Sequence, residues 1–189
     1  FVRGQTFEFA SRKPIEELHE AKALGYHTRP VLLGPVSYLL LGKSKADGFD
    51  PLTLLPGLLP VYEAVLRALA AEGADWVQID EPCLVLDLPE AARTALTAAY
   101  AALSKAATGA RLMLTTYFGA LGDNATTALA LPVAGLHVDL VRAPRQLTEI
   151  AAEASADQVL SLGVIDGRNV WRANLPAILD HVEPILRLR

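Results

Sequence analysis

Short apolar runs alternate with stretches of helical periodicity from one end of the chain to the other, and this alternation limits the possible folds more than any other feature. The runs lie at 30–34, 76–80, 111–116, 135–140 and 158–164. Their length and β-rich composition favour strands. Strands that alternate with helices are typical of parallel sheets, in which a crossover helix joins neighbouring strands. We therefore predict an α/β fold with about five parallel βα units.

The segments between the runs carry signals for helix starts and ends. Helices are predicted at 14–24, at 60–72, at about 89–107, at about 144–155, and from about residue 174. Pro14 and Pro60 suit a first helical turn, and Asn174 suits an N-cap. Glycines follow the first three predicted helices at Gly25, Gly73 and Gly109. Pro184 should kink the fifth helix or mark its last turn.

The length of the chain leaves two architectures open. The chain has 189 residues, and no low-complexity linker divides it, so we expect one domain or part of one. An open doubly wound sheet of five strands fits this length, whereas a complete (βα)8 barrel needs about 250 residues. The motifs GxGxxG and GxxxxGK[ST] do not occur, which argues against the nucleotide-binding versions of the doubly wound fold. The other possibility is a partial TIM-type (βα)8 barrel that lacks some strands.

Composition excludes several classes of partner. The net charge is −4 and no long run of like charges occurs, so nucleic acid is not an expected partner. Glycine and proline interrupt apolar runs such as 29–42 well short of the ~20 residues of a spanning helix, so no membrane segment is expected. Cys83 is the only cysteine, which excludes an internal disulfide and a multi-thiolate zinc site and fits a reducing, cytoplasmic setting. The chain begins at Phe1 and its only methionine is Met113, so we expect 1–189 to be a piece of a longer protein.

The stretch "WVQIDEPCLV" at 76–85 places two carboxylates, Asp80 and Glu81, at the end of an apolar strand. Neighbours on a strand point to opposite faces, so these two carboxylates cannot face each other as a catalytic pair. One hypothesis makes Asp80 a ligand-facing carboxylate and Glu81 a loop residue at the rim of the site. The alternative is structural: both residues cap the following backbone and form ion pairs where the strand ends.

The same alternation separates a polar from an apolar face on two strands. Gln78 and Asp80 share one face of the second strand, and His137 and Asp139 share one face of the fourth. In a barrel these polar faces would point into the interior, near the carboxyl ends of the strands where such folds build their sites. The pair formed by His137 and Asp139 can be read as metal ligands or as a hydrogen-bonded interior pair.

Two further strand ends carry polar groups. The segment "LTTYFGALGDN" at 114–124 offers hydroxyls and glycines that suit a polar ligand or a phosphate, or simply form a turn. In "GVIDGRNVW" at 163–171, Arg168 can hold a carboxylate or pair with Asp166. We expect Cys83, which has no histidine near it in sequence, to be a buried and inert thiol.

Several segments together resemble the family of cobalamin-independent methionine synthases. They are "RPVLLGPVSYLLLGK", "LLPVYEAVLRALAAEGADWVQIDEPCLVLDLP", "LTTYFG", "LPVAGLHVDLVR" and "GVIDGRNVWRANL", and the match extends in order over essentially all 189 residues. That family transfers a methyl group from 5-methyltetrahydropteroyltriglutamate to homocysteine and has two similar (βα)8 barrels. The resemblance implies that 1–189 is the later part of the amino-terminal barrel.

The resemblance also implies that this part holds no metal. In the family's carboxy-terminal barrel, an "IDEP" strand end binds homocysteine, and neighbouring strands carry a His-x-Cys pair and a glutamate that bind zinc. Asp80 corresponds to the homocysteine-binding aspartate, but Leu114-Thr115-Thr116-Tyr117 stands at the His-x-Cys position and Asp139 stands near the glutamate position. Hydroxyls do not replace an imidazole and a thiolate as zinc ligands. Zinc is therefore expected in the carboxy-terminal barrel of the parent enzyme and not in this chain.

The function implied by the resemblance is support of folate binding and packing against the carboxy-terminal barrel, with no catalytic residue in this piece and no activity of the piece alone. Substrate-binding residues are expected among Asp80, Glu81, Asp139 and Arg168. The positive charges of Lys43, Lys45 and Arg168 suggest that these three residues contact the negatively charged polyglutamate tail of the folate. Two alternatives remain: a free-standing α/β module that binds a small anionic ligand, and a domain that serves only as a scaffold.

Overall fold

Five parallel strands form a single sheet in chain order in the computed structural model, which describes residues 1–45 and 47–187. The strands are β1 (Val31–Leu33), β2 (Trp76–Asp80), β3 (Arg111–Thr115), β4 (Gly135–Asp139) and β5 (Val159–Gly163). All five predicted strands are confirmed, with ends that differ by at most one residue. The parallel pairing confirms the α/β class.

Seven α-helices and three short 3-10 helices connect the strands in the described residues. The α-helices are α1 (Lys13–Ala23), α2 (Pro35–Leu41), α3 (Leu55–Ala71), α4 (Glu90–Ala106), α5 (Ala125–Ala130), α6 (Gln146–Glu153) and α7 (Leu175–Leu186). The 3-10 helices are η1 (Pro51–Leu54), η2 (Pro82–Val85) and η3 (Gly122–Asn124). The five predicted helices correspond to α1, α3, α4, α6 and α7.

The predicted helix ends are largely confirmed. Gly25, Gly73 and Gly109 have φ of 81°, 76° and 93°, a left-handed conformation that ends a helix at little steric cost when the residue is glycine. The side chain of Asn174 caps α7 by accepting a hydrogen bond from the Ala177 amide. Pro184 lies in the last turn of α7, as expected.

The start predicted for α3 is wrong, and α2 and α5 were missed. Helix α3 begins at Leu55, and Pro60 lies inside it. Pro56 occupies the first turn instead, where the missing N–H has no partner in the helix. Helix α2 has seven residues and α5 has six, too few turns for periodicity to distinguish them from apolar loops.

The segment Pro51–Ala71, which includes η1 and α3, is long and apolar enough to cross a membrane by length and composition alone. No membrane segment was expected from the sequence, in which the helix was predicted to begin at Pro60, whereas α3 begins at Leu55 and continues through Pro60. The core helix of a globular protein passes the same test. Leu55, Leu58, Leu66 and Leu69 of α3 are buried in the hydrophobic core, and 28% of the apolar window is buried in all.

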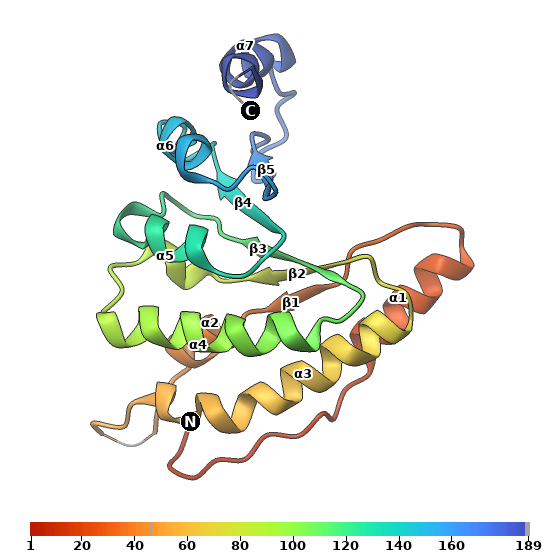
Figure 1. Cartoon of the computed structure of the whole chain (residues 1–189), viewed down its shortest axis with the longest axis vertical. Helices are drawn as coiled ribbons and strands as arrows, with labels where there is room; N and C mark the ends of the chain where they lie inside the picture. Colours follow the sequence, from red (N-terminus) through yellow and green to blue (C-terminus); the bar gives the residue numbers. More distant parts are fainter. Residues whose placement is uncertain (46, 188–189) are drawn as a thin grey trace.

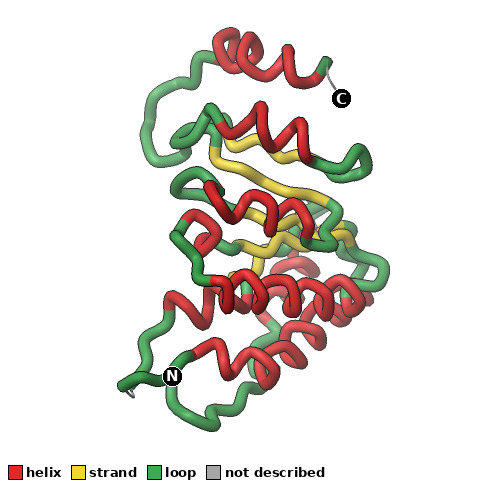
Figure 2. Tube along the Cα trace, turned by 60° about the vertical axis from the view of Figure 1, so that its left-hand side comes forward, coloured by secondary structure: helices red, strands yellow, loops and turns green. Residues whose placement is uncertain are grey.

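The sheet is not closed. Figure 1 shows the strands stacked from β1 to β5, with the N-terminus near the β1 end and α7 beyond β5. Figure 2 shows the helices layered along the strands. Among the described residues β1 and β5 do not pair, so each leaves one edge open. An open five-stranded parallel sheet of this kind fits a partial barrel.

The two faces of the sheet differ in burial. The helix-covered face consists of apolar side chains that are at most 3% exposed, namely Val77, Ile79, Leu112, Leu114, Leu136 and Val138. The strand register places Leu33, Asp80, Thr115, His137 and Ser161 side by side in one row of the opposite face. This opposite face therefore carries the polar groups, and we refer to it as the open face.

Candidate functional site

Asp80 lies at the carboxyl end of β2, on the open face, and is only half-buried. Its Oδ1 accepts a hydrogen bond from Gln78 Nε2 at 2.7 Å, and its Oδ2 accepts one from the Tyr117 hydroxyl at 3.2 Å. Each carboxylate oxygen can accept more than one hydrogen bond. The geometry therefore fixes the orientation of Asp80 and leaves it capacity for a ligand.

Glu81 faces the other way and is fully buried. Its carboxylate accepts hydrogen bonds from the amides of Val36 and Ser37, at 3.3 and 2.7 Å, in the first turn of α2. The Cys83 thiol lies 3.7 Å from the same carboxylate. The expectation of a loop residue at the rim is wrong for Glu81, because the chain turns inward after β2 and the first turn of α2 supplies free amides there.

The burial of Glu81 has two consequences. Burial raises the pKa of Glu81 to about 7, and its hydrogen bonds with Ser37 and Val36 offset part of that rise. In addition, a Cβ added at Gly34 would lie 2.1 Å from Glu81 Cδ, so only glycine fits beside this carboxylate. Glu81, which follows β2, is thus bonded to the first turn of α2, which follows β1, and it links the two strand ends on the helix-covered side of the sheet.

Asp139 is also fully engaged within the protein. It is 4% exposed and accepts hydrogen bonds from the amides of Phe118, Val141 and Arg142, each at 3.0 Å. The Arg142 guanidinium adds an ion pair at 3.1 Å. Burial pushes the pKa of Asp139 up, but the bonds with Arg142 and Phe118 outweigh it, and the pKa is lowered. Asp139 therefore holds the loops after β3 and β4 together, and its partners are the Phe118, Val141 and Arg142 groups and not His137, with which an interior pair was the structural alternative.

The loop after β3 presents two aromatic side chains beside these carboxylates. Tyr117 and Phe118 make an edge contact with ring centroids 4.7 Å apart. Burial, and then the charge of Asp80, raise the pKa of Tyr117 to about 12, so its hydroxyl stays a hydrogen-bond donor. Phe118 is the one non-glycine residue with positive φ in the described chain, at 83°, and it is 59% exposed. Its amide donates a hydrogen bond to Asp139 Oδ2 at 3.0 Å, which ties the backbone of this loop to the carboxyl end of β4.

The remaining groups of the open face do not form a metal site. His137 Nδ1 lies 2.8 Å from Ser161 Oγ, so the histidine pairs with a hydroxyl rather than with Asp139. Burial lowers the pKa of His137. The Thr115 hydroxyl is buried without a hydrogen-bond partner among the described residues. In the part of the chain that the structure describes, no group of three or more His, Cys, Asp or Glu side chains is placed to hold a metal ion.

Cys83 gives no thiolate ligand either. It is fully buried, and burial together with the nearby Glu81 charge raises its pKa to about 12. Its amide donates to the Ser37 hydroxyl at 3.0 Å, so η2 is held against α2. The donor set of this chain, with threonines at 115 and 116 and an inaccessible thiol, does not fit zinc.

Arg168 lies in the exposed loop after β5. Its backbone amide, not its guanidinium, bonds to Asp166, at 3.0 Å, and Asp166 also accepts from Asn169 at 2.8 Å. The guanidinium of Arg168 is thus not held by Asp166. Lys43 and Lys45 lie in the loop after α2, near the amino terminus and toward the β1 end of the sheet (Figure 1). The structure does not bring these lysines together with Arg168, because β1 and β5 are opposite edges.

Two residues that organise this site, Arg142 and Gln146, are not among those predicted from the sequence. Arg142 follows Asp139 by three residues, a spacing that permits an ion pair in a turn and was available as a signal. Gln146 donates to the carbonyl of Asp139 at 2.8 Å and accepts from the Leu121 amide at 3.1 Å. No local pattern reveals this contact, because it joins two loops that only the folded sheet brings together.

Comparison with known proteins supports the resemblance over the whole chain. Residues 1–189 match the family model "Cobalamin-independent synthase, N-terminal domain". A relative from Nitrobacter winogradskyi is 65% identical over all 189 residues, and one from Caulobacter vibrioides is 63% identical over 98% of the chain. One from Rhodopseudomonas palustris is 61% identical over 189 residues. All three are named 5-methyltetrahydropteroyltriglutamate–homocysteine methyltransferase.

The chain spans only 24% of the length of these relatives. A short chain that matches one domain model from end to end is expected to carry the features of that domain alone. The open sheet of five parallel strands is consistent with this. The chain therefore belongs to the family of cobalamin-independent synthases, in which it matches the N-terminal domain.

Proposed function

We propose that residues 1–189 are the later part of the amino-terminal (βα)8 barrel of a two-barrel, cytoplasmic methionine synthase. The complete polypeptide transfers a methyl group from 5-methyltetrahydropteroyltriglutamate to homocysteine. The observation that carries this proposal is the match of the whole chain, at 65% identity, to about a quarter of a relative named for that reaction. The unclosed sheet supports it, because β1 and β5 each leave an edge that further strands of a barrel would pair.

In this proposal the chain does not supply the catalytic metal. Homocysteine reacts as a thiolate, and a cationic metal is the usual means to hold a thiolate at neutral pH. Zinc would serve that purpose in the carboxy-terminal barrel, which is the partner of this chain in the same polypeptide. Here the residues at the corresponding strand end are Thr115 and Thr116, so no step of the reaction is assigned to this chain.

The role that remains is to bind and orient part of the folate substrate. Asp80 supports this role because Gln78 and Tyr117 fix its carboxylate toward the open face. Asp139 acts indirectly, since it positions the Phe118 loop and Arg142. Arg168 is exposed and its guanidinium is available for a carboxylate. Glu81 is not proposed to contact a ligand, because no part of it is exposed.

Kinetics of the complete polypeptide test this proposal. Wild type should form methionine from 5-methyltetrahydropteroyltriglutamate and homocysteine without cobalamin, and the isolated 189-residue chain should not. Asp80→Asn removes the charge and keeps the shape, so we expect KM for the folate to rise with little change in kcat. Unchanged KM for both substrates would instead favour a purely scaffolding role for this barrel. Failure of the wild-type polypeptide to transfer the methyl group would overturn the proposed function itself.

A further inference from the structure

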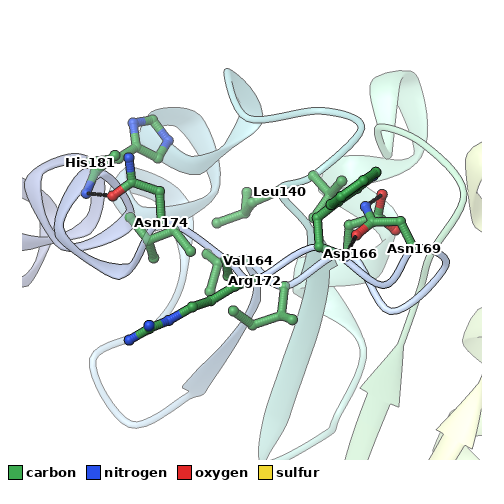
Figure 3. Close-up of a pocket in the computed structure, with 13 residues that line it drawn as sticks. Leu140, Val164, Asp166, Asn169, Arg172, Asn174 and His181 are labelled. Atoms are coloured by element: carbon green, nitrogen blue, oxygen red, sulfur yellow. Dashed lines mark hydrogen bonds between the residues drawn. The ribbon is translucent and has the colours of Figure 1, made fainter.

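Two groups of polar side chains near the strand ends differ in how far this chain encloses them. Figure 3 shows one of them, a pocket of about 410 Å³ in which Asp166 and Asn169 lie on one side and Asn174 on the other. This pocket lies at the β5 edge, which pairs with no further strand among the described residues. The other group surrounds the fully buried Glu81 and consists of Ser37 on α2, Tyr62 on α3, Cys83 on η2 and Tyr100 on α4. The geometry of the second group is therefore set by this chain alone.

The Glu81 carboxyl group is buried among neutral groups. It accepts hydrogen bonds from the amides of Val36 and Ser37, and no ion pair reaches it in the described part of the chain. A buried carboxylate without a cation is costly, whereas a buried neutral acid is not. Burial raises the pKa of Glu81 to about 7, and it also raises the pKa values of Tyr62, Cys83 and Tyr100. Glu81 is thus the member of this group that changes its charge near neutral pH.

Backbone hydrogen bonds connect Glu81 with the open face. The peptide unit between Asp80 and Glu81 bonds on both sides: its N–H donates to the Thr115 carbonyl at 2.8 Å, and its carbonyl accepts from the Gly34 amide at 2.7 Å. Gly34 is also the N-cap of α2, whose first amides donate to the Glu81 carboxyl group. This one peptide unit therefore joins the ends of β1 and β3, and the side chain that follows it is bonded to the helix after β1.

The Asp80 side chain and its partner Tyr117 both depend on this peptide unit. Asp80 is part of it, and Tyr117 follows the bonded Thr115 by two residues. The Tyr117 hydroxyl donates to Asp80 Oδ2 at 3.2 Å, which is already long for an O–H···O bond. The Glu81 side chain has little room to move, because even a Cβ at Gly34 would lie 2.1 Å from its Cδ. A change in the bonding of the Glu81 carboxyl group therefore shifts the backbone that carries Asp80.

We propose that Glu81 is a positioning residue for the site on the open face. With its proton, it holds the peptide unit so that Asp80 meets Tyr117. Without its proton, the uncompensated buried charge displaces this unit and weakens the contact between Asp80 and Tyr117. This inference rests on the proposed function, in which Asp80 contacts the folate, and it adds a regulation of that site. The affinity for the folate is then high at slightly acidic pH and falls as pH rises through about 7.

The pH profile of KM for 5-methyltetrahydropteroyltriglutamate in the complete polypeptide tests this inference. The protonated fraction of a group with a pKa of about 7 falls about tenfold from pH 6 to pH 8, so KM of the wild type should rise about tenfold. Glu81→Gln keeps the shape and stays neutral, so its KM should stay low and lack this rise. Asp80→Asn should have a high KM at both pH values, because it changes the group that Glu81 positions. The matched control is Glu63→Gln, which removes a carboxylate that pairs with Arg67 on α3 and should keep the wild-type profile.

Crystal structures of the wild-type polypeptide at pH 6 and pH 8 test the geometry independently of the reaction. The hydrogen bond between Asp80 and Tyr117 should be present at pH 6 and longer or absent at pH 8, whereas in Glu81→Gln it should be the same at both. Infrared difference spectra between the two pH values should show a carboxylic-acid band in wild type that Glu81→Gln lacks. An Asp80–Tyr117 distance that does not change with pH in wild type would overturn the positioning role.

These measurements separate the two proposals. If wild type forms methionine and its KM depends on pH as that of Glu81→Gln does, the positioning role is wrong while the proposed function stands. If wild type forms no methionine, the proposed function is wrong, and the two crystal structures still decide whether Glu81 positions Asp80. Thermal unfolding of each variant checks that a change in KM is not a loss of fold.

Discussion

Asp80 and Glu81 are neighbours in sequence, yet their carboxylates lie on the two opposite faces of the sheet. Asp80 is half-buried on the open face and is held by two side chains. Glu81 is fully buried on the helix-covered face and is held by two backbone amides. The helix-covered face thus has its packing partners within the described chain, whereas the open face leaves the Asp80 carboxylate partly exposed.

The apolar side chains of the two faces show the same difference in burial. On the helix-covered face Leu136 is fully buried against the core. On the open face Val31, Leu33 and Val159 are 53%, 43% and 46% exposed. These three lie on the two edge strands, where further strands of a barrel would cover them. The helix-covered face thus buries most of the apolar side chains of the sheet, and the open face leaves apolar side chains of the edge strands and several polar groups partly exposed.

The largest expected effect comes from a pair of matched truncations. Leu136→Ala should lower the free energy of unfolding by about 2–5 kcal/mol, because it leaves a cavity in a closed core. Leu33→Ala removes the same atoms from a half-exposed position and should cost less than about 1 kcal/mol. Chemical denaturation of both variants measures the difference. Equal losses would mean that the open face is as well packed as the helix-covered face, and the comparison would fail.

The second prediction concerns the pH dependence that Glu81 imposes. Its folded-state pKa of about 7 lies above its ordinary value of 4.5, so the folded chain binds more protons than the unfolded chain between these two pH values. Stability from this group is therefore full below about pH 4.5 and falls as pH rises through 7, by about 3 kcal/mol in total. Glu81→Gln should abolish this part of the pH dependence.

The measurement is the difference in unfolding free energy between wild type and Glu81→Gln from pH 4.5 to pH 8, because other titrating groups then cancel. Tyr62, Cys83 and Tyr100 surround Glu81, and burial raises the pKa of each, so they stay neutral in this range. A constant difference across the range would show that Glu81 is charged throughout and that the amides of α2 compensate its burial.

The strand-level architecture follows from the sequence because each strand is a short apolar run between helical segments. Residues 76–80 show the reason most clearly: alternation on a strand places Gln78 and Asp80 together, and the structure joins them by a hydrogen bond. The same rule separated Asp80 from Glu81. Local periodicity thus determines which face a residue occupies.

The partners of Glu81 and Asp139 could not be predicted from the sequence in the same way. The position of Glu81 depends on the first turn of α2, a helix of seven residues that no periodicity signal distinguishes from a loop. Asp139 looked like a candidate ligand residue, but its partners come from a loop 21 residues earlier and from the turn after it. Such contacts depend on the register of β3 against β4, which local patterns do not contain.

The third prediction compares the two aspartates of the strand ends. Asp139→Ala should lower the free energy of unfolding by about 2 kcal/mol, because three backbone amides and Arg142 lose their acceptor. Asp80→Ala should cost less than about 1 kcal/mol, since Asp80 is half-buried and bonds only to side chains. Because the pKa of Asp139 is lowered, its contribution is present above its unfolded pKa and is lost as pH falls below about 4. Denaturation at pH 7 and pH 3 should therefore show a smaller gap between Asp139→Ala and wild type at the lower pH.

The smallest expected effect separates the contribution of the Phe118 backbone conformation to stability from the contribution of its aromatic ring. A residue with a Cβ at φ of 83° is strained by roughly 1 kcal/mol, whereas glycine is not. Phe118→Gly should therefore be about 1 kcal/mol more stable than Phe118→Ala, although both variants lose the same aromatic contact with Tyr117. Thermal and chemical unfolding of the pair measure this difference. Equal stability of the alanine and glycine variants would mean that residue 118 of the alanine variant has relaxed to negative φ. In that case the hydrogen bond from its amide to Asp139 does not impose the positive φ, and the Phe118 ring does.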